Sequence, residues 1–214
     1  DKIRFTTSVY KLAVHQPVIV AKQLSSLAVM CDNRFGFGVG ISPWPEDFEI
    51  VGEQWAGRGK RMDEMIAIIR GLHSGDYFEF EGEFYQMPAN KMCPVPSQQT
   101  PILTGGHAEI ALKRAAQSAD GWIHAGGDSD TLKGYIDKIQ NYRKEFGTDN
   151  KAFEIHAISA DAFTVEGVKK LEALGVTECI VGFRDAYKGD LDTTSADDKI
   201  KMMQWYADNI IAKC

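Results

Sequence analysis

The strongest constraint on the fold is a regular alternation of strand-like and helix-like segments along the whole chain of 214 residues. Runs of β-branched and aromatic residues predict strands, and apolar residues at helical spacing predict helices between them. This alternation is typical of a parallel sheet covered by helices, because parallel strands need a crossover connection. Six such units fit both an open doubly wound sheet and a closed barrel. The expected strands are 3–9, 34–40, 101–104, 121–125, 153–160 and 176–183, and the expected helices are 18–30, 58–72, 108–119, 131–146, 165–174 and 197–212.

Two segments depart from this alternation. Residues 76–87 alternate with a period of two around Gly82, which predicts a small β-hairpin inserted into a single domain of residues 1–214. Pro43 and Pro45 interrupt the chain after the second strand and predict a loop there. The chain opens at Asp1 and enters a strand almost at once, so we expect the native protein to carry a further N-terminal segment.

The composition is that of a globular protein, with 44% hydrophobic and 25% charged residues. A net charge of −6 argues against nucleic acid or an anionic membrane as the main partner. Cysteines are far apart without metal-type spacing, so we expect free, mostly buried thiols in a reducing cytoplasm. No apolar stretch approaches the roughly 18 residues that a membrane-spanning helix requires.

Glycines at alternate positions in Gly36-Phe-Gly-Val-Gly40 suggest a ligand-binding strand. A dinucleotide fingerprint requires that the glycine turn open directly into a helix, and the prolines at 43 and 45 disfavour this interpretation. Small residues on a strand instead allow a flat ligand to lie close to the backbone.

Two later glycine pairs follow predicted strands. Gly105 and Gly106 with His107 lie before a helix, where free N–H groups bind phosphate well, although a plain tight turn fits the same residues. Gly126 and Gly127 precede Asp128-Ser129, which we interpret mainly as a helix cap.

The histidines offer a weaker metal hypothesis. His124 and His156 lie on successive predicted strands, as ligands do in metal-dependent barrel hydrolases. Because neither an H-x-H pair nor an H-E-x-x-H helix is present, ordinary hydrogen-bonded histidines fit better and no metal is expected. His124 remains a candidate for a polar group in a binding pocket. Trp44, which lies between two prolines, is a candidate for an aromatic group in such a pocket.

The order of several motifs resembles the luciferase-like monooxygenase family of flavin- and deazaflavin (F420)-dependent oxidoreductases. The resemblance runs from about residue 3 to 147 and weakens beyond. It implies a (β/α)₈ barrel in which the six units correspond to strands 3–8, the first two being absent. The motifs are Thr6-Thr-Ser-Val-Tyr10, His15-Gln-Pro-Val, Ala21-Lys-Gln, Asn33-Arg-Phe-Gly-Phe-Gly-Val-Gly40, Pro45-Glu-Asp-Phe48, Arg58-Gly-Lys-Arg-Met-Asp-Glu64, Phe80-Glu-Gly-Glu-Phe-Tyr85, Pro101-Ile-Leu-Thr-Gly-Gly106 and Ala119-Asp-Gly-Trp122.

The resemblance also implies a site for F420 or FMN at the carboxyl ends of the strands. Trp44 and His124 are then candidates for the catalytic or substrate side, and a cis peptide or bulge is expected at Ser8–Val9. F420 is favoured over FMN because the segment 42–48 is similar to F420-type members. The implied cofactor contacts are Ser8 and Val9 beneath the ring, Gly38, Val39 and Gly40 lining its pocket, and Gly105, Gly106 and His107 at the phosphate.

The function implied is oxidation or reduction of a small organic substrate by a homodimer that pairs through the helix 18–30. The first alternative is a non-catalytic flavin-binding protein or a partner subunit. The second is a metal-dependent barrel hydrolase.

Overall fold

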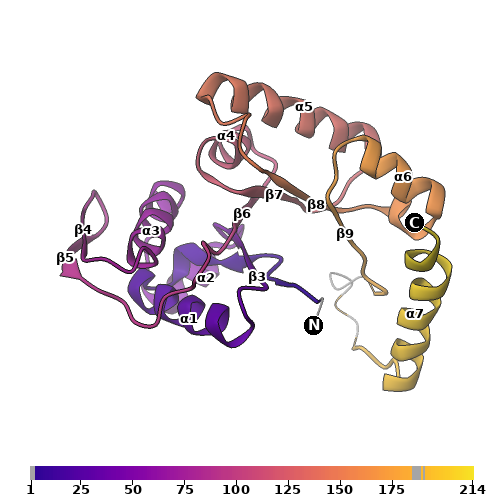
Figure 1. The fold of residues 1–214 in the computed structure, drawn as a ribbon, viewed down its shortest axis with the longest axis horizontal. Coiled ribbons are helices and arrows are strands. Elements are labelled where there is room, and N and C mark those ends of the chain that lie inside the picture. The colour runs from indigo at the N-terminus through magenta and orange to yellow at the C-terminus, as the bar shows by residue number, and fades with distance from the viewer. Residues whose placement is uncertain (1–2, 185–188, 190) are drawn as a thin grey trace. The chain divides into compact units, whose positions relative to one another are not determined.

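A computed structural model describes residues 3–184, 189 and 191–214. The chain divides into two compact units, Asp1–Gly105 and Gly106–Cys214. In each unit the strands of the main sheet are parallel and helices lie between them along the chain, as the alternating sequence pattern predicts (Figure 1).

The sheet of the first unit is built around β3 (Phe35–Gly40), which pairs in parallel with three other strands. These strands are β1 (Phe5–Thr6), β2 (Tyr10–Lys11) and β6 (Ile102–Gly105). The single strand expected over 3–9 is therefore wrong in extent, because the chain leaves the ladder between Thr6 and Tyr10. The Ser8–Val9 peptide bond in this interruption is cis, which confirms the expectation at that position.

Three helices and a 3₁₀ turn cover this sheet: η1 (Leu12–Val14), α1 (Pro17–Met30), α2 (Pro45–Val51) and α3 (Arg58–Leu72). Pro17 occupies the first turn of α1, where its missing N–H costs nothing. The loop predicted at Pro43 and Pro45 is partly wrong, because Pro45 starts α2 and Gly52, at φ 73°, ends it. A seven-residue helix is too short to show a clear apolar period.

The predicted hairpin is present as β4 (Phe78–Glu81) and the longer β5 (Gln86–Asn90). Its turn is fixed to α3 by one carboxylate. Glu64 accepts the main-chain N–H groups of Glu83 at 2.7 Å, Phe84 at 3.0 Å and Tyr85 at 3.1 Å.

The second unit holds a parallel sheet of β7 (Gly121–His124), β8 (Glu154–Ile158) and β9 (Glu178–Ile180). Figure 1 shows α4 and α5 side by side next to β7. The strand predicted over 176–183 is reduced to three residues in β9. The helical elements are α4 (Glu109–Ser118), α5 (Ser129–Phe146), η2 (Ala160–Phe163), α6 (Val165–Ala173), α7 (Ala196–Asn209) and η4 (Ile211–Lys213).

Each unit has its own apolar core. Phe37 and Val39 of β3 pack against α1 and α3 in the first, and Trp122 and Ile155 pack against α4 and α5 in the second. All four cysteines are free, as predicted, but the expectation that most are buried is wrong: Cys93 and Cys214 are exposed and the other two are half-buried. Among the described residues, no helix has the length and apolarity needed to cross a membrane.

Candidate functional site

One face of β3 carries no side chains of its own, and the three glycines on it are buried. Since successive residues of a strand point to opposite faces, the core positions of Phe37 and Val39 place Gly36, Gly38 and Gly40 on the other face. The side chain of Val39 therefore lies in the core, and only its main chain remains to contact a ligand on the glycine face.

The interrupted strand lies beside this face. A Cβ built on Gly40 would lie only 2.8 Å from Cγ2 of Val9, so the two residues are in close contact. Thr7 fixes the interruption by donating its hydroxyl to the carbonyl of Gly38 at 2.8 Å. Ser8 and Val9 are both exposed. The predicted ring contacts Ser8, Val9, Gly38 and Gly40 thus lie close together, with Ser8 and Val9 in the interruption between β1 and β2 and the glycines on β3.

Trp44 lies just beyond the end of β3 and is 45% exposed. The ammonium of Lys11 stands 4.5 Å from the centre of its ring and 2.6 Å from Oδ2 of Asp47. Hydrogen bonds from Lys11 and then Ser42 hold the pKa of the Asp47 carboxyl below its usual value. The Asp47 carboxyl is therefore ionised at neutral pH.

In the second unit, Gly106 and His107 precede the first turn of α4. Gly106 has φ 121°, a conformation that L residues rarely adopt. The first main-chain bonds of α4 run from the N–H groups of Ala111 and Leu112 to the carbonyl of Ala108, and no side chain caps the helix. The N–H groups before them lie outside this ladder and point out of the helix end, as an anion requires.

His107 belongs to an aromatic cluster with Trp122, His124 and Tyr135. Its ring stacks on Tyr135 with centroids 4.7 Å apart, and it lies 4.9 Å from the ring of His124. Nε2 of His107 accepts the N–H of Ala125 at 3.3 Å, so the proton of the neutral ring is on Nδ1. Burial lowers the pKa of His107, which favours this neutral form.

His124 is fully buried in this cluster. It lies on the helix-facing side of β7 together with Trp122, whose Nε1 donates to the carbonyl of Gly106 at 3.0 Å. Neither ring nitrogen of His124 has a hydrogen bond of regular geometry within the described structure. Burial and the neighbouring His107 ring lower the pKa of His124, while the main chain of Ile158 raises it. In this unit His124 supports His107 and does not reach the surface.

The loop after β7 starts α5 as the sequence indicates. Asp128 caps the helix by accepting the N–H of Thr131 at 2.7 Å, which confirms its interpretation as a cap. A polar pocket of about 630 Å³, partly open to solvent, adjoins this loop. The hydroxyl of Ser129 donates to Asp161, whose carboxylate also faces Lys170. The residues that line this polar pocket are Gly127, Asp128, Ser129, Asp130, Ser159, Ala160, Asp161 and Lys170.

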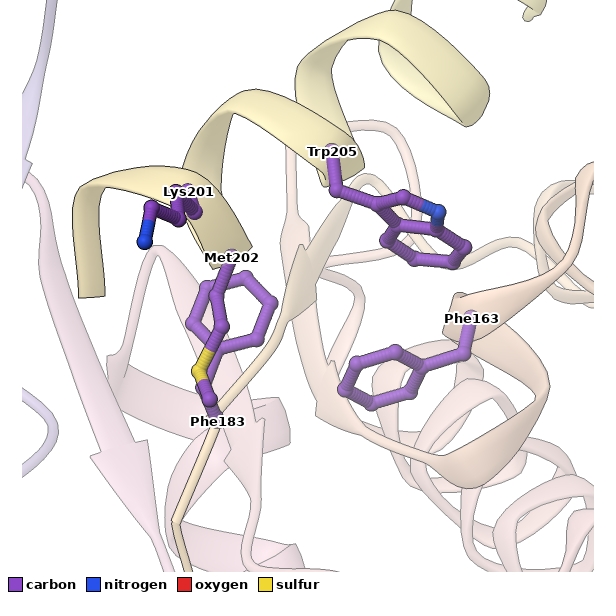
Figure 2. Close-up of a pocket in the computed structure, with 5 residues that line it drawn as sticks. All are labelled: Phe163, Phe183, Lys201, Met202 and Trp205. Carbon is purple, nitrogen blue, oxygen red and sulfur yellow. The ribbon is translucent and has the colours of Figure 1, made fainter. Parts of the chain in front are cut away.

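A second pocket of the same unit, about 480 Å³ including open solvent, is almost entirely apolar. Figure 2 shows Trp205 and Met202 of α7 directed toward Phe163 and Phe183, while the amine of Lys201 points away from the rings. Phe163 and Phe183 meet edge to face at 6.2 Å. The sequence did not suggest this pocket, because its members come from three segments.

The histidines on β7 and β8 are not arranged as metal ligands. His124 pairs in register with Ala157, and His156 with Ile123, so the two rings lie on opposite faces of the sheet. His156 instead contacts Oε2 of Glu154 at 2.8 Å. Within the described part of the chain, no three potential ligands converge on one point.

Sequence reasoning missed Lys11, Ser42 and Asp47 as neighbours of Trp44. In the sequence, Asp47 stands out only as a member of the motif Pro45-Glu-Asp-Phe48. Lys11 lies 36 positions before Asp47 in the chain, so no local pattern links the two. Only the pairing of β2 with β3 brings them together. Tyr135 was missed in the same way, because an isolated aromatic residue on an amphipathic helix carries no signal for a cluster with histidines.

Comparison with known proteins identifies the family. The model for the luciferase-like monooxygenases matches residues 1–182. An uncharacterized protein of Mycobacterium tuberculosis (strain ATCC 25618 / H37Rv) is 54% identical over 212 residues, which cover 99% of this chain and 73% of that protein. The FMNH₂-dependent dimethylsulfone monooxygenase of Pseudomonas fluorescens (strain Pf0-1) is 30% identical over 129 residues, covering 58% of this chain and 35% of that protein.

Solved structures agree on the fold. An F420-dependent secondary alcohol dehydrogenase, solved with an F420–acetone adduct, superposes with a TM-score of 0.67 at 22% identity. The match covers 74% of this chain and 49% of that one, so this chain spans about half the length of the solved structure. The α/β fold with parallel strands is therefore that of the luciferase-like enzymes.

Proposed function

This chain belongs to the luciferase-like monooxygenase family, and we propose that it is a flavin- or deazaflavin-dependent oxidoreductase that acts on a small organic substrate. The observation that carries the proposal is the glycine face of β3 beside Val9. A planar ring needs close access to a backbone, and the three glycines of this face give the strand no side chain of its own there.

The residues of the first unit fit a tricyclic ring. Gly38 and Gly40 have no side chain that would hold a ligand away from the backbone, and the exposed residue Val9 packs against Gly40. We assign Ser8, Val9, Gly38, Gly40 and the main chain of Val39 to ring binding. The cofactor, when bound, supplies the hydride or oxygen chemistry, and these residues position it.

The residues that precede α4 in the chain fit a phosphate. The first N–H groups of α4 and the Nδ1–H of His107 are all donors, as a phosphate requires. We assign Gly105, Gly106 and His107 to phosphate binding. We assign His124 the role of holding the His107 ring in place, and we assign Trp44 to the substrate side.

For the cofactor, we propose F420 on the strength of the segment 42–48 and treat FMN as the alternative. The names of relatives include both FMNH₂- and F420-dependent enzymes. We also propose a cytoplasmic homodimer that pairs through α1. The outer face of α1 carries three exposed apolar side chains. Ile19, Leu27 and Met30 are 58%, 43% and 82% exposed.

The test is a titration of the purified protein with FMN and with F420, followed by absorbance and fluorescence. Gly40→Ala places a methyl group against Val9 on the glycine face, so we expect it to weaken binding at least about tenfold, or 1.4 kcal/mol. Gly134→Ala is the matched control, because a Cβ at Gly134 of α5 meets nothing within 4 Å. Equal affinities of both variants and the wild type would reject the assigned ring site.

Turnover separates catalysis from simple binding. A bound cofactor that is reduced and reoxidised at the expense of a small organic substrate supports an oxidoreductase. A cofactor that binds but is never turned over identifies a non-catalytic flavin-binding protein or partner subunit.

A further inference from the structure

Lys11 lies on the same face of the sheet as the glycines of β3. It pairs in register with Gly40, and paired residues of parallel strands point the same way. Its neighbour Tyr10 points to the opposite face, where its ring packs against Phe37 at 5.4 Å. Lys11 therefore projects beside Val9 and Gly40, where the proposed ring would lie.

The ammonium of Lys11 is held in one direction. Asp47 binds it at 2.6 Å, and the indole of Trp44 lies beneath it at 4.5 Å. An ammonium has three N–H donors, and Asp47 is the one acceptor that the described structure gives it. The side chain of Lys11 is 40% exposed and that of Asp47 only 25%, so the positive group is the outer member of the pair.

Ser42 fixes both partners of Lys11. Its hydroxyl donates to the Asp47 carboxylate and accepts the main-chain N–H of Trp44 at 3.2 Å. Ser42 is 5% exposed and has φ 61°, a conformation that is unfavourable for a residue with a side chain. A strained, buried residue is a costly way to support a surface ion pair, which by itself contributes about 0–1 kcal/mol. Such strain is typical of functional sites.

We propose that Lys11 and Trp44 form the recognition site for a planar, anionic organic substrate. The ammonium binds the carboxylate or oxyanion of the substrate, and the indole packs against its planar part. Almost half of the indole surface is exposed and available for this contact. Asp47 and Ser42 are positioning residues that direct the ammonium and the indole. The proposal deepens the proposed function, on which it rests, by naming the substrate class.

The test compares two probes of the same shape, benzoate and the neutral benzamide, by calorimetric titration into the protein with and without cofactor. We expect benzoate to bind about tenfold more tightly than benzamide. Lys11→Met should abolish this preference and leave benzamide binding unchanged, while Lys11→Arg should retain it. Trp44→Ala should weaken the binding of both probes.

Lys60→Met is the matched control, because Lys60 forms an exposed ion pair with Glu83 at 3.3 Å in the same unit. It should leave the preference intact. Equal binding of benzoate and benzamide to the wild type overturns the proposal, as does a preference that survives Lys11→Met. Cofactor titration of the same samples separates a failure of the proposed substrate class from a failure of the proposed function. Cofactor binding without a benzoate preference rejects only the substrate class, and a preference without cofactor binding rejects only the proposed function.

Discussion

Arg61 is the residue whose replacement best tests the structure around the substrate side. It is 4% exposed, and its guanidinium binds three oxygens. Nη2 donates to the carbonyls of Ala13 at 2.9 Å and Gln54 at 3.0 Å, and Nη1 donates to Glu53 at 2.9 Å. Ala13 is in η1, which directly follows Lys11. Arg61 therefore fixes the segment that carries Lys11.

Arg61→Lys keeps the positive charge but removes the planar guanidinium group, whose two terminal nitrogens donate in different directions. A lysine in this place can keep the contact with Glu53 but cannot reach both carbonyls, so two charge-assisted bonds are lost. Each such bond contributes roughly 1.5–3 kcal/mol. Because the surrounding groups compensate for part of the loss of two bonds, we expect the free energy of unfolding to fall by about 3 kcal/mol. For a chain of this length that corresponds to a fall in Tm of about 6–12 °C.

The assay is urea unfolding followed by circular dichroism, with the thermal melt as a second measurement. Arg58→Lys is the control, because Arg58 stacks on Trp55 at 3.4 Å and donates one bond of 3.3 Å to the Trp55 carbonyl. It should cost far less than Arg61→Lys. A loss below about 0.5 kcal/mol for Arg61→Lys, within the range of ordinary surface substitutions, would refute the role assigned to Arg61.

Burial lowers the pKa of both His107 and His124, so their protonation opposes folding and stability should fall as the pH drops below about 6.5. His124→Phe, which removes two nitrogens without regular hydrogen bonds, should reduce that fall in pH-dependent melts; an unchanged pH profile would count against it. Gly106→Ala should destabilise by about 1–3 kcal/mol because of its φ of 121°, whereas Gly134→Ala should stabilise by about 0.5–1 kcal/mol; equal melting temperatures would contradict both assignments. Glu64→Ala should release the hairpin turn and make residues 81–85 sensitive to limited proteolysis, while Glu64→Gln, which keeps one acceptor oxygen, should be less sensitive; resistance equal to wild type in both would exclude this anchor.

Most elements could be predicted because their signals are local. The helix Arg58–Leu72 has the predicted bounds, since its apolar stripe covers four turns and faces one core. Helix α2 was missed because its seven residues carry only one buried apolar side chain, Phe48. Strand 3–9 was overestimated because composition does not reveal where a strand leaves its ladder.

The candidate site could be predicted best where glycines carry the signal. Gly40 packs against Val9 and Gly106 has φ 121°, so both positions favour glycine in the structure, while their assignment to a cofactor stays a prediction. The direction of a side chain was harder to predict, because it depends on the pairing of strands. Val39 and His124 both turn to the helix side of their strands, and Lys11 joins Trp44 only through the register of β2 with β3.

The central claim is that this chain binds a flavin or deazaflavin through the glycine face of β3. Native mass spectrometry of the full-length protein, purified from its own host, measures this directly. We expect one bound molecule per chain with the mass of F420 or FMN, lost from the Gly40→Ala variant and retained by Gly134→Ala. A wild-type protein that carries neither molecule, and takes up neither when they are added in excess, would contradict the account.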